Sequence, residues 1–480
     1  MSNTTQEPTV ANVKGNDNGN QITALPHNII TLPQGKTAAN VVAERHDMVL
    51  LLEAVKANPN GDPDNDNMPR TNPMTLRGFM TDGCLKRKVR NFFSLYHPNG
   101  TLKNEDERAQ KGYEIFVRES AVFETTMSST EVKTEQEELL KELVQQLQTK
   151  RNGESPDAAT LTPQNQFDVT QASLLQNQAQ AQAIVPGADN KPDRGKGKGA
   201  SKSDKEESIS MYERDSNELS QRAFRDALCK MFFDVRAFGQ VASTKGPLLG
   251  SFFGQIRGPL QFEFAESLDK VLQLDASITR CALTTGKEAE DTQKQVEAGK
   301  TQATNATDDS DAEESTRGNR TMGRKRWVDY GLYRTHIFFS PAFAQKTKFT
   351  YRDLDNFLFA LQNMFRDDSS SARPGGLRVV GLIDFQHSTA LGNAPAHKLF
   401  DLVKVERKLQ SDTDEREFPE SLKDYHGASP KGEVTLNGSS QTNNGSVSNN
   451  NAVTARRIVW DIPLKTEEPS ATSGTSTNQT

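Results

Sequence analysis

The sequence predicts an α+β fold, in which helices and strands are interleaved along the chain. Three observations carry this prediction: an almost unbroken apolar run from Met48 to Val55, and two stretches with apolar residues at helical spacing, beginning near Asp82 and Asp353. An unbroken apolar run of this length is typical of a strand covered on both faces. Apolar residues at positions i, i+4, i+7 and i+8 form one buried face of a helix.

The first helix is expected to follow Thr81 or Asp82, because either side chain can accept a hydrogen bond from a free N–H of the first turn. Its buried positions are Leu85, Val89, Phe92 and Phe93. Alternating apolar residues then predict strands at 260–264 and 333–339, and apolar stretches at 278–283 and 377–385 indicate two more.

The second helix is expected to be capped by Asp353. Its buried face contains Leu354, Phe357, Leu358, Leu361 and Phe365. With the polar insertions removed, the order is strand, helix, strands, helix, strand. This βαββαβ order is the split βαβ pattern of a ferredoxin-like or RNA-recognition-motif core.

Polar, low-complexity segments divide the chain. Residues 1–44 are expected to form a disordered arm, residues 151–206 a low-complexity insertion, and residues 411–480 a mostly flexible tail with one strand at 455–464. The folded part therefore consists of residues 45–150, which hold the first helix, and residues 207–410. A further insertion at about 284–330 contains the acidic run DDSDAEE.

The overall composition excludes several classes of protein. Lysine and arginine number 58 against 64 acidic residues, so a nucleic-acid surface would have to come from local clustering of cations. The three cysteines lie far apart without a CxxC pair, which argues against a disulfide framework or a thiolate zinc site. The longest apolar run is too short to span a bilayer, and the amino terminus lacks a signal-peptide pattern. We expect a soluble, cytoplasmic protein with no membrane partner.

The segment 54-AVKANPNGDPDNDNMPRTNP-73 places Asp62, Asp64 and Asp66 at alternate positions, as at the start of an EF-hand loop. The match then fails, because Asn67 stands where such a loop needs glycine and Pro73 stands where it needs glutamate. The turn-forming pairs instead predict a rigid connection after the first strand, without a metal or a cofactor.

The first basic patch lies on and before the first helix. The segment 82-DGCLKRKVRNFF-93 has four cations in five positions, and two arginines precede it. These candidate RNA-binding residues are Arg70, Arg77, Lys86, Arg87, Lys88 and Arg90. With Leu85 and Val89 turned inward, the helix cations are expected to spread around the outer surface. They form either a solvated helix face or a binding site for a phosphate backbone. The second alternative is favoured because cations side by side repel one another and a polyanion offsets this repulsion.

The second basic patch contains Arg324, Lys325 and Arg326, with Trp327 and other aromatic residues close by. Cations beside exposed aromatic rings are the ingredients of single-strand nucleic-acid binding, although the rings could also pack in the core. The patch follows an insertion between two strands and is expected at the base of a projecting hairpin. No aromatic RNP1 pattern is present, so RNA would be held by its phosphates and shape rather than its sequence.

No catalytic residue is predicted. His336, His387, His397 and Cys84 have no partner at motif spacing, and the chain contains neither a GxSxG nor a Walker motif.

Several blocks occur in an order that resembles a known family. They include NPNGDPDNDNMPRT, TDGCLKRKVRN, MFFDVRAFGQV, GQIRGPLQFEFAESLD, TMGRKR and LGNAPAHKLFDLVKVER. Together they resemble the backbone subunit of the type I-C CRISPR interference complex (Cascade), of the Cas-seven family, Csd-two kind, within the RAMP superfamily. The resemblance covers residues 45–150 and 207–410.

The resemblance implies a modified RNA-recognition-motif core with a thumb-like hairpin, and a role in antiviral defence. Copies of such a subunit polymerise along one crRNA, which then pairs with target DNA. The implied partners are crRNA, target DNA, further copies of the chain, the processing and large subunits, and the helicase-nuclease. The subunit itself is not an enzyme.

Carried over to this chain, the resemblance assigns guide phosphates to Lys86, Arg87, Lys88 and Arg90, flanked by Arg70 and Arg77, and then to Arg324, Lys325 and Arg326. Arg236, Gly239 and Gly258 are further candidates for a close approach to RNA. The alternative is a target-RNA-cleaving subunit of the type III kind, with Asp62 or Asp64 supporting metal-assisted cleavage.

Overall fold

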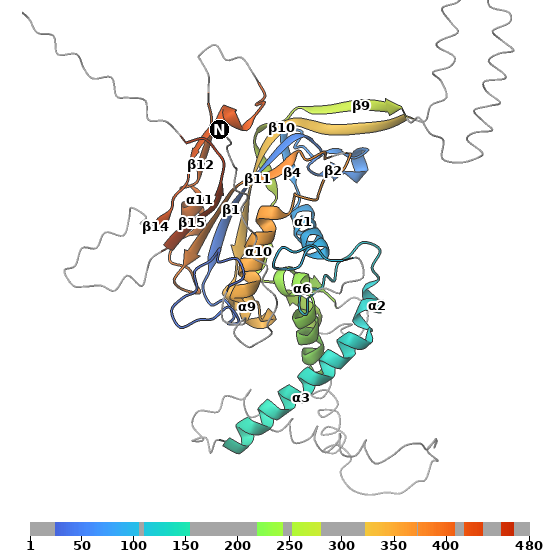
Figure 1. Ribbon diagram of the computed structural model, residues 1–480, viewed down its shortest axis with the longest axis vertical. Helices are drawn as coiled ribbons and strands as arrows, with labels where there is room; N and C mark the ends of the chain where they lie inside the picture. The colour runs from blue at the N-terminus through green and yellow to red at the C-terminus, as the bar shows by residue number, and fades with distance from the viewer. Residues whose placement is uncertain are drawn as a thin grey trace, which may run out of the picture. The chain divides into compact units, whose positions relative to one another are not determined.

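The computed structural model, drawn in Figure 1, describes residues 25–104, 110–153, 218–242, 252–279, 322–371, 373–408, 417–434 and 453–464. The chain divides into two compact units. We call them the sheet unit (Arg45–Val89, Phe262–Phe338 and Leu361–Thr480) and the helical unit (Met1–Glu44, Arg90–Gln261 and Phe339–Ala360). Among the described residues, no helix combines the length and the apolarity that a membrane span requires.

The sheet unit is built on one large sheet with the strand order β14-β15-β11-β1-β10-β8-β4, and β9 pairs with β10 beside this path. The strands of this path, in chain order, are β1 (His46–Ala57), β4 (Arg77–Met80), β8 (Ala265–Lys270), β10 (Met322–Phe339), β11 (Leu377–His387), β14 (Gly432–Val434) and β15 (Val453–Trp460). The pairs β1–β11, β11–β15, β14–β15, β8–β10 and β4–β8 are antiparallel. The expected α+β class is therefore confirmed.

Smaller elements complete the sheet unit. They are β2 (Gly61–Asp62), η2 (Pro63–Asn65), β3 (Met68–Pro69), β9 (Gln273–Thr279), α11 (Ala396–Phe400), β12 (Lys404–Arg407), η4 (Leu422–Asp424) and β13 (Tyr425–Ala428). The apolar core draws residues from β1, β10, β11 and β15, and adds Leu399 and Phe400 of α11. Burial of these side chains away from water is the main force that stabilises this unit.

The helical unit contains α2 (Phe123–Met127), α3 (Thr130–Gly153), helical residues 218–231, α6 (Phe233–Phe238) and α9 (Pro341–Thr347). Strand β7 (Leu260–Phe262) pairs with β10 of the large sheet. Within the helical unit, a short ladder joins β5 (Gly239–Val241) to β6 (Gln255–Arg257), next to η3 (Phe252–Gly254). Its own apolar core includes Phe116, Phe224, Leu228 and Phe232. Helices α1 (Asp82–Leu95) and α10 (Tyr351–Asn363) each begin in one unit and end in the other.

Several expected boundaries are displaced. The strand expected at 260–264 ends at Phe262, and Phe264 is 56% exposed. The strand expected at 278–283 is β9, which starts at Gln273; residues 280–283 lie outside the described part. The strand expected at 333–339 is the end of the 18-residue β10.

The cap of α10 is also corrected. Asp353 is the third residue of the helix, and Thr350 precedes it. The Thr350 amide donates to Asp353 Oδ2 at 2.9 Å, and the Asp353 amide donates to Thr350 Oγ1 at 3.2 Å. This reciprocal pair is a capping box, in which Thr350 is the N-cap residue and Asp353 occupies the third position of the helix. Because aspartate is also a common N-cap residue, the sequence alone favoured Asp353 as the cap.

The disorder expected for residues 1–44 is wrong for residues 25–44, and residues 1–24 lie outside the described part. Asp355, a fully buried residue of α10, accepts hydrogen bonds from the backbone amides of His27, Ile29 and Ile30 at 2.7, 2.8 and 3.3 Å. The His27 ring also stacks on Phe359 with 3.7 Å between centroids. This segment is thus fixed in part by a distant carboxylate that its own composition cannot reveal.

The tail expected to be mostly flexible, residues 411–480, includes ordered parts at 417–434 and 453–464. Where a strand was expected at 455–464, the structure has β15, which lies between β11 and β14 in the sheet. Of the expected insertions, residues 154–206 and 284–321 lie outside the described residues, whereas residues 151–153 form the end of α3.

Candidate nucleic-acid interface

The second basic patch lies on a two-stranded ribbon formed by β9 and the first part of β10, which Figure 1 shows as a long antiparallel pair. Because directly opposed residues share a face, Arg324 and Arg326 lie on the same face as Ser277 and Asp275. Lys325 and Trp327, opposed to Ala276 and Leu274, lie on the other face. The alternation of a strand therefore splits the three consecutive cations between two faces.

The face with Arg326 is anchored to the loop after β1; we call it the anchored face. Arg326 forms an ion pair with Asp66 at 3.2 Å, and its side chain is only 9% exposed. On the same face, Gln273 Nε2 donates to the Pro69 carbonyl at 2.5 Å. Arg324 pairs with Asp275 at 3.0 Å but remains 61% exposed. The contacts of Arg326 and Gln273 with this loop fix the direction of the ribbon.

The opposite face, which we call the open face, presents a cation beside an aromatic ring. The Nζ atom of Lys325 lies 6.0 Å from the centroid of the Trp327 ring, and both side chains are half-buried. Ile278, at the far end of β9, is 45% exposed on this face. In single-stranded nucleic acid, a cation can pair with a phosphate, and an aromatic ring and an aliphatic group can pack against the faces of the bases. The open face therefore carries the groups that such a strand requires.

The first basic patch is only partly on the surface. The prediction that all four helix cations spread around the outer surface is wrong for Lys88 and Arg90. Lys88 is buried and pairs with Asp368 at 2.6 Å, while Arg90 pairs with the buried Asp234 at 2.9 Å. Lys88 follows the buried Leu85 by three residues, which places both on one side of the helix.

The other members of this patch are more accessible. Arg87 and Arg77 are exposed. Lys86 pairs with Asp82 at 2.9 Å, one helical turn earlier, and Arg70 pairs with Asp62 at 3.1 Å. Phosphate contacts by Lys86 and Arg70 would therefore compete with carboxylates that already hold them.

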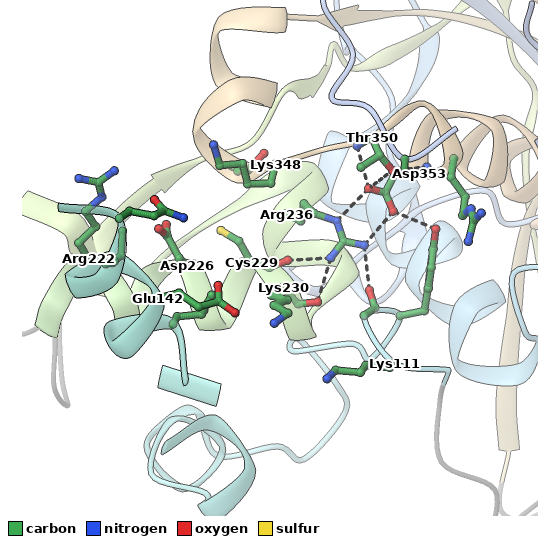
Figure 2. Close-up of a pocket in the computed structure, with 18 residues that line it drawn as sticks. Lys111, Glu142, Arg222, Asp226, Cys229, Lys230, Arg236, Lys348, Thr350 and Asp353 are labelled. Atoms are coloured by element: carbon green, nitrogen blue, oxygen red, sulfur yellow. Dashed lines mark hydrogen bonds and ion pairs between the residues drawn. The ribbon is translucent and has the colours of Figure 1, made fainter. Parts of the chain in front are cut away.

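Arg236, another expected RNA contact, is buried inside the helical unit. Its guanidinium donates to both carboxylate oxygens of Asp353, at 3.0 and 2.8 Å, and to the carbonyls of Cys229 and Gly112, at 2.7 and 2.8 Å (Figure 2). Burial alone would raise the pKa of Asp353, but the charge and hydrogen bonds of Arg236 hold that pKa below its usual range. Arg236 therefore serves the fold, and its assignment to RNA is corrected.

This ion pair lies beside a cavity of about 510 Å³, whose lining includes Lys111, Arg222, Lys230 and Lys348. Cys229 also lines it (Figure 2). Burial raises the pKa of Cys229 to about 12, so the thiol stays protonated at neutral pH and is a poor nucleophile.

The close backbone approach expected at Gly239 and Gly258 is made within the chain. A Cβ atom on Gly239 would lie 2.3 Å from the Ile256 carbonyl oxygen, and one on Gly258 would lie 2.4 Å from the Ala237 carbonyl oxygen. Gly239 permits β5 to pair closely with β6, and Gly258 permits the residue after β6 to approach the end of α6.

The loop after β1 is held by its own side chains. Asp62 caps η2 by accepting from the Asp64 amide at 3.4 Å, and Asn60 Oδ1 accepts from the Thr81 amide at 2.9 Å. Asn58 Nδ2 donates to the Asn67 carbonyl at 2.7 Å. Across the described part of the chain, no group of three or more His, Cys, Asp or Glu side chains is arranged to hold a metal.

Two of the three histidines singled out in the sequence have structural partners. His387 Nε2 lies 2.9 Å from the buried Asp47 carboxylate, and His336 Nδ1 lies 2.7 Å from Glu263. The His336 ring also stacks on Phe400 with 4.1 Å between centroids. His397 is exposed on α11.

One family of known proteins matches most of the chain. The model of the family described as CRISPR-associated protein Cas7 matches residues 44–428. No curated protein matches the chain. A chain of a solved "CRISPR RNA-guided surveillance complex, pre-nicking" shows 11% identity and a TM-score of 0.31, over 71% of this chain and 78% of that one. A chain of a "CRISPR RNA-guided surveillance complex" shows 11% identity and a TM-score of 0.25, over 71% and 75%. Because these TM-scores are below 0.5, the assignment rests on the family model.

Proposed function

The chain belongs to the CRISPR-associated protein Cas7 family, and we propose that it is a crRNA-binding backbone subunit of a type I-C CRISPR interference complex. Several copies polymerise along one crRNA and present it to target DNA. Base pairing then supplies the sequence specificity, and the protein supplies the geometry. Contacts to the processing subunit, the large subunit and the helicase-nuclease belong to the same proposal.

The observation that carries this proposal is the open face of the β9–β10 ribbon. Lys325 and Trp327 stand side by side on it, while Arg326 and Gln273 fix the opposite face to the loop after β1. A rigid ribbon can hold an RNA strand in one shape without loss of its own conformational freedom. In this proposal the ribbon is the thumb-like hairpin, and the large sheet is the RNA-recognition-motif-like palm.

Further phosphate contacts come from cations that the fold leaves accessible. Arg77 and Arg87 are exposed, and Arg324 keeps 61% of its side chain exposed beside Asp275. Lys88, Arg90 and Arg236 are left out, because each is held by a carboxylate in its own unit.

The salt dependence of RNA binding tests the proposal. The full chain is titrated with a synthetic single-stranded RNA at several salt concentrations, as wild type and as Lys325→Gln, Arg77→Gln and Trp327→Ala. Each lost phosphate contact should lower the slope of log K against log salt by about 0.7. Loss of the Trp327 ring should weaken binding by about 1–3 kcal/mol and leave that slope unchanged.

The matched control is Lys398→Gln, which removes one exposed cation on α11. It should change neither the slope nor the affinity. If Lys325→Gln and Arg77→Gln behave like this control, the proposed interface is wrong.

The proposal also holds that the subunit is not an enzyme. The type III alternative would need Asp62 or Asp64 to support a metal, whereas the Asp62 carboxylate pairs with Arg70 and caps η2. Incubation of the assembled complex with complementary RNA and Mg²⁺ should leave that RNA intact. Regularly spaced cuts that disappear in Asp62→Asn or Asp64→Asn would support the alternative.

A further inference from the structure

The cavity beside the Arg236–Asp353 ion pair lies wholly within the helical unit. Its volume of about 510 Å³ falls within the range of about 300–1,000 Å³ that small-molecule sites occupy. Most of its wall comes from α3, helical residues 218–231, residues 111–113, and residues 347–353, where α9 ends and α10 begins (Figure 2). None of the RNA contacts proposed above lies here.

The walls of this cavity are bonded to one another. Gln136 of α3 donates through Nε2 to the Ser220 carbonyl at 3.1 Å, which joins α3 to the next helix. The Arg236 guanidinium donates to the Gly112 carbonyl and to Asp353 at the start of α10, both at 2.8 Å. A space held in this way is formed in advance, so a ligand would enter it without a large loss of conformational freedom.

The lining is cationic, although the whole chain has a net charge of −6. Six cationic side chains face three carboxylates in the lining, namely Lys111, Arg222, Lys230, Arg236, Lys348 and Arg352 against Glu142, Asp226 and Asp353. Asp353 is already paired with Arg236. Asp226 is paired with Arg225 at 2.5 Å. Cations gathered in a cleft with walls of low dielectric constant concentrate anions there.

Several of these cations are not balanced by a carboxylate. Lys111 and Lys230 share the single carboxylate of Glu135, which leaves one positive charge in excess. Arg222 and Lys348 are exposed, and neither has an ion-pair partner among the described residues. Cations around one cavity repel one another, and an anion inside the cavity would offset this repulsion.

Lys348 is held in a strained backbone conformation. It has φ of 62°, in the left-handed region, and its amide donates to the Ala344 carbonyl at the end of α9. Glycine or asparagine usually fills this position of a helix end, because a Cβ atom strains the backbone there. A lysine retained at such a position, on the wall of a cationic cavity, indicates that its ammonium group has a function.

The rest of the lining suits a sugar and a base. Leu139 and Leu143, both half-buried on α3, give the cavity an apolar wall. Glu142, on the same helix, is exposed and pairs with no cation in the described part of the chain. In nucleotide sites, a carboxylate accepts hydrogen bonds from ribose hydroxyls. Towards inorganic phosphate, the same carboxylate would only be repulsive.

We propose that this cavity binds a free nucleoside diphosphate. Lys348 and Arg222 bind its phosphates, with the excess charge of the Lys111 and Lys230 pair beside them. Glu142 accepts hydrogen bonds from the ribose, and the leucines of α3 pack against the base. The inference goes beyond crRNA binding and does not depend on it, because the two proposals use different residues.

The test is isothermal titration calorimetry of the full chain with ADP, GDP, CDP and UDP. At least one of them should bind, and its nucleoside should bind about tenfold more weakly, since the phosphate contacts are missing. Lys348→Gly should weaken binding of the tightest diphosphate about tenfold, because a charge-assisted contact is lost. Glycine accepts the positive φ, so α9 should still end at this position and Tm should not fall.

Glu142→Ala distinguishes a nucleotide from a simple anion. It should weaken binding of the diphosphate about fivefold, because the ribose loses its acceptor. It should strengthen binding of inorganic pyrophosphate, because a negative charge is removed. The matched control is Lys346→Gln, which removes an exposed cation of α9 that does not line the cavity. This control should leave both affinities unchanged.

The inference is overturned if no diphosphate binds, or if Lys348→Gly binds it as tightly as the wild type does. If Glu142→Ala strengthens binding of the diphosphate as well as of pyrophosphate, the cavity is a site for simple anions and the nucleotide is refuted. Titration of Lys348→Gly with single-stranded RNA should give the wild-type salt slope; a lower slope would place Lys348 in the RNA interface and refute the inference. A chain that binds the diphosphate as predicted, but no RNA, would refute the proposed function and support this inference.

Discussion

Replacement of Arg236 by methionine should destabilise the protein strongly and leave its RNA binding intact. The variant removes the donors that satisfy both oxygens of Asp353 and keeps a side chain of similar length. Asp353 would then be a buried carboxylate without its cation, held only by weaker donors such as Thr350 and the Tyr113 hydroxyl. Its proton affinity would rise, because burial disfavours the charged form.

The expected magnitude follows from this geometry. Removal of one partner from a buried ion pair costs about 3–5 kcal/mol. For a domain of this size, each kcal/mol lowers Tm by about 2–4 °C, so the loss should be on the order of 10 °C. The double variant Arg236→Met/Asp353→Leu, which removes both charges, should recover part of this loss.

Thermal unfolding followed by circular dichroism gives Tm, and RNA titration well below Tm gives the salt slope of the folded protein. We predict a lower Tm with an unchanged slope for Arg236→Met. Arg77→Gln should behave in the opposite way, with an unchanged Tm and a slope smaller by about 0.7. A reduced slope together with an unchanged Tm for Arg236→Met would refute the structural role of Arg236.

Three further predictions concern stability. Leu76→Gly should raise the free energy of unfolding by about 1 kcal/mol, measured by urea titration, since Leu76 has φ of 58° and glycine adopts positive φ without strain; a destabilised variant would contradict strain at Leu76. Lys88→Met should lower the free energy of unfolding by about 3 kcal/mol, because it leaves the largely buried Asp368 with one cation fewer; a loss under 0.5 kcal/mol would show that the pair is solvated. Burial would raise the pKa of Asp47, but hydrogen bonds from His387 and Arg45 lower that pKa below 3.8. The stabilisation that the Asp47 carboxylate contributes is therefore complete above about pH 3.8 and is lost as the pH falls through the lower pKa of the folded state. In Asp47→Asn, the free energy of unfolding should therefore fall less steeply as the pH is lowered.

Local patterns in the sequence were sufficient for the elements that carry strong periodicity. The apolar run at 48–55 lies inside β1, and the helical spacing after Asp82 and Asp353 lies inside α1 and α10. Helix α3 was missed, although Leu139, Leu143 and Leu147 recur at helical spacing within its mostly polar sequence. The place of β15 between β11 and β14 depends on pairing across more than sixty residues, which no local pattern records.

The same distinction explains the candidate site. Arg77 and Arg87 are exposed as the sequence suggested, because each lies where local structure turns it outward. Lys88, Arg90 and Arg236 look like their neighbours in the sequence, but their carboxylate partners lie 280, 144 and 117 residues away along the chain. Charge runs thus locate a basic region, and only the tertiary fold divides it into structural and accessible cations.

The most direct test of a crRNA-binding backbone subunit is to isolate the native protein from cells and to identify the nucleic acid that accompanies it. The account predicts short crRNAs of uniform length, with several copies of the chain on each RNA, measured by sequencing and native mass spectrometry. A monomer free of nucleic acid, which also fails to assemble on added crRNA, would contradict it.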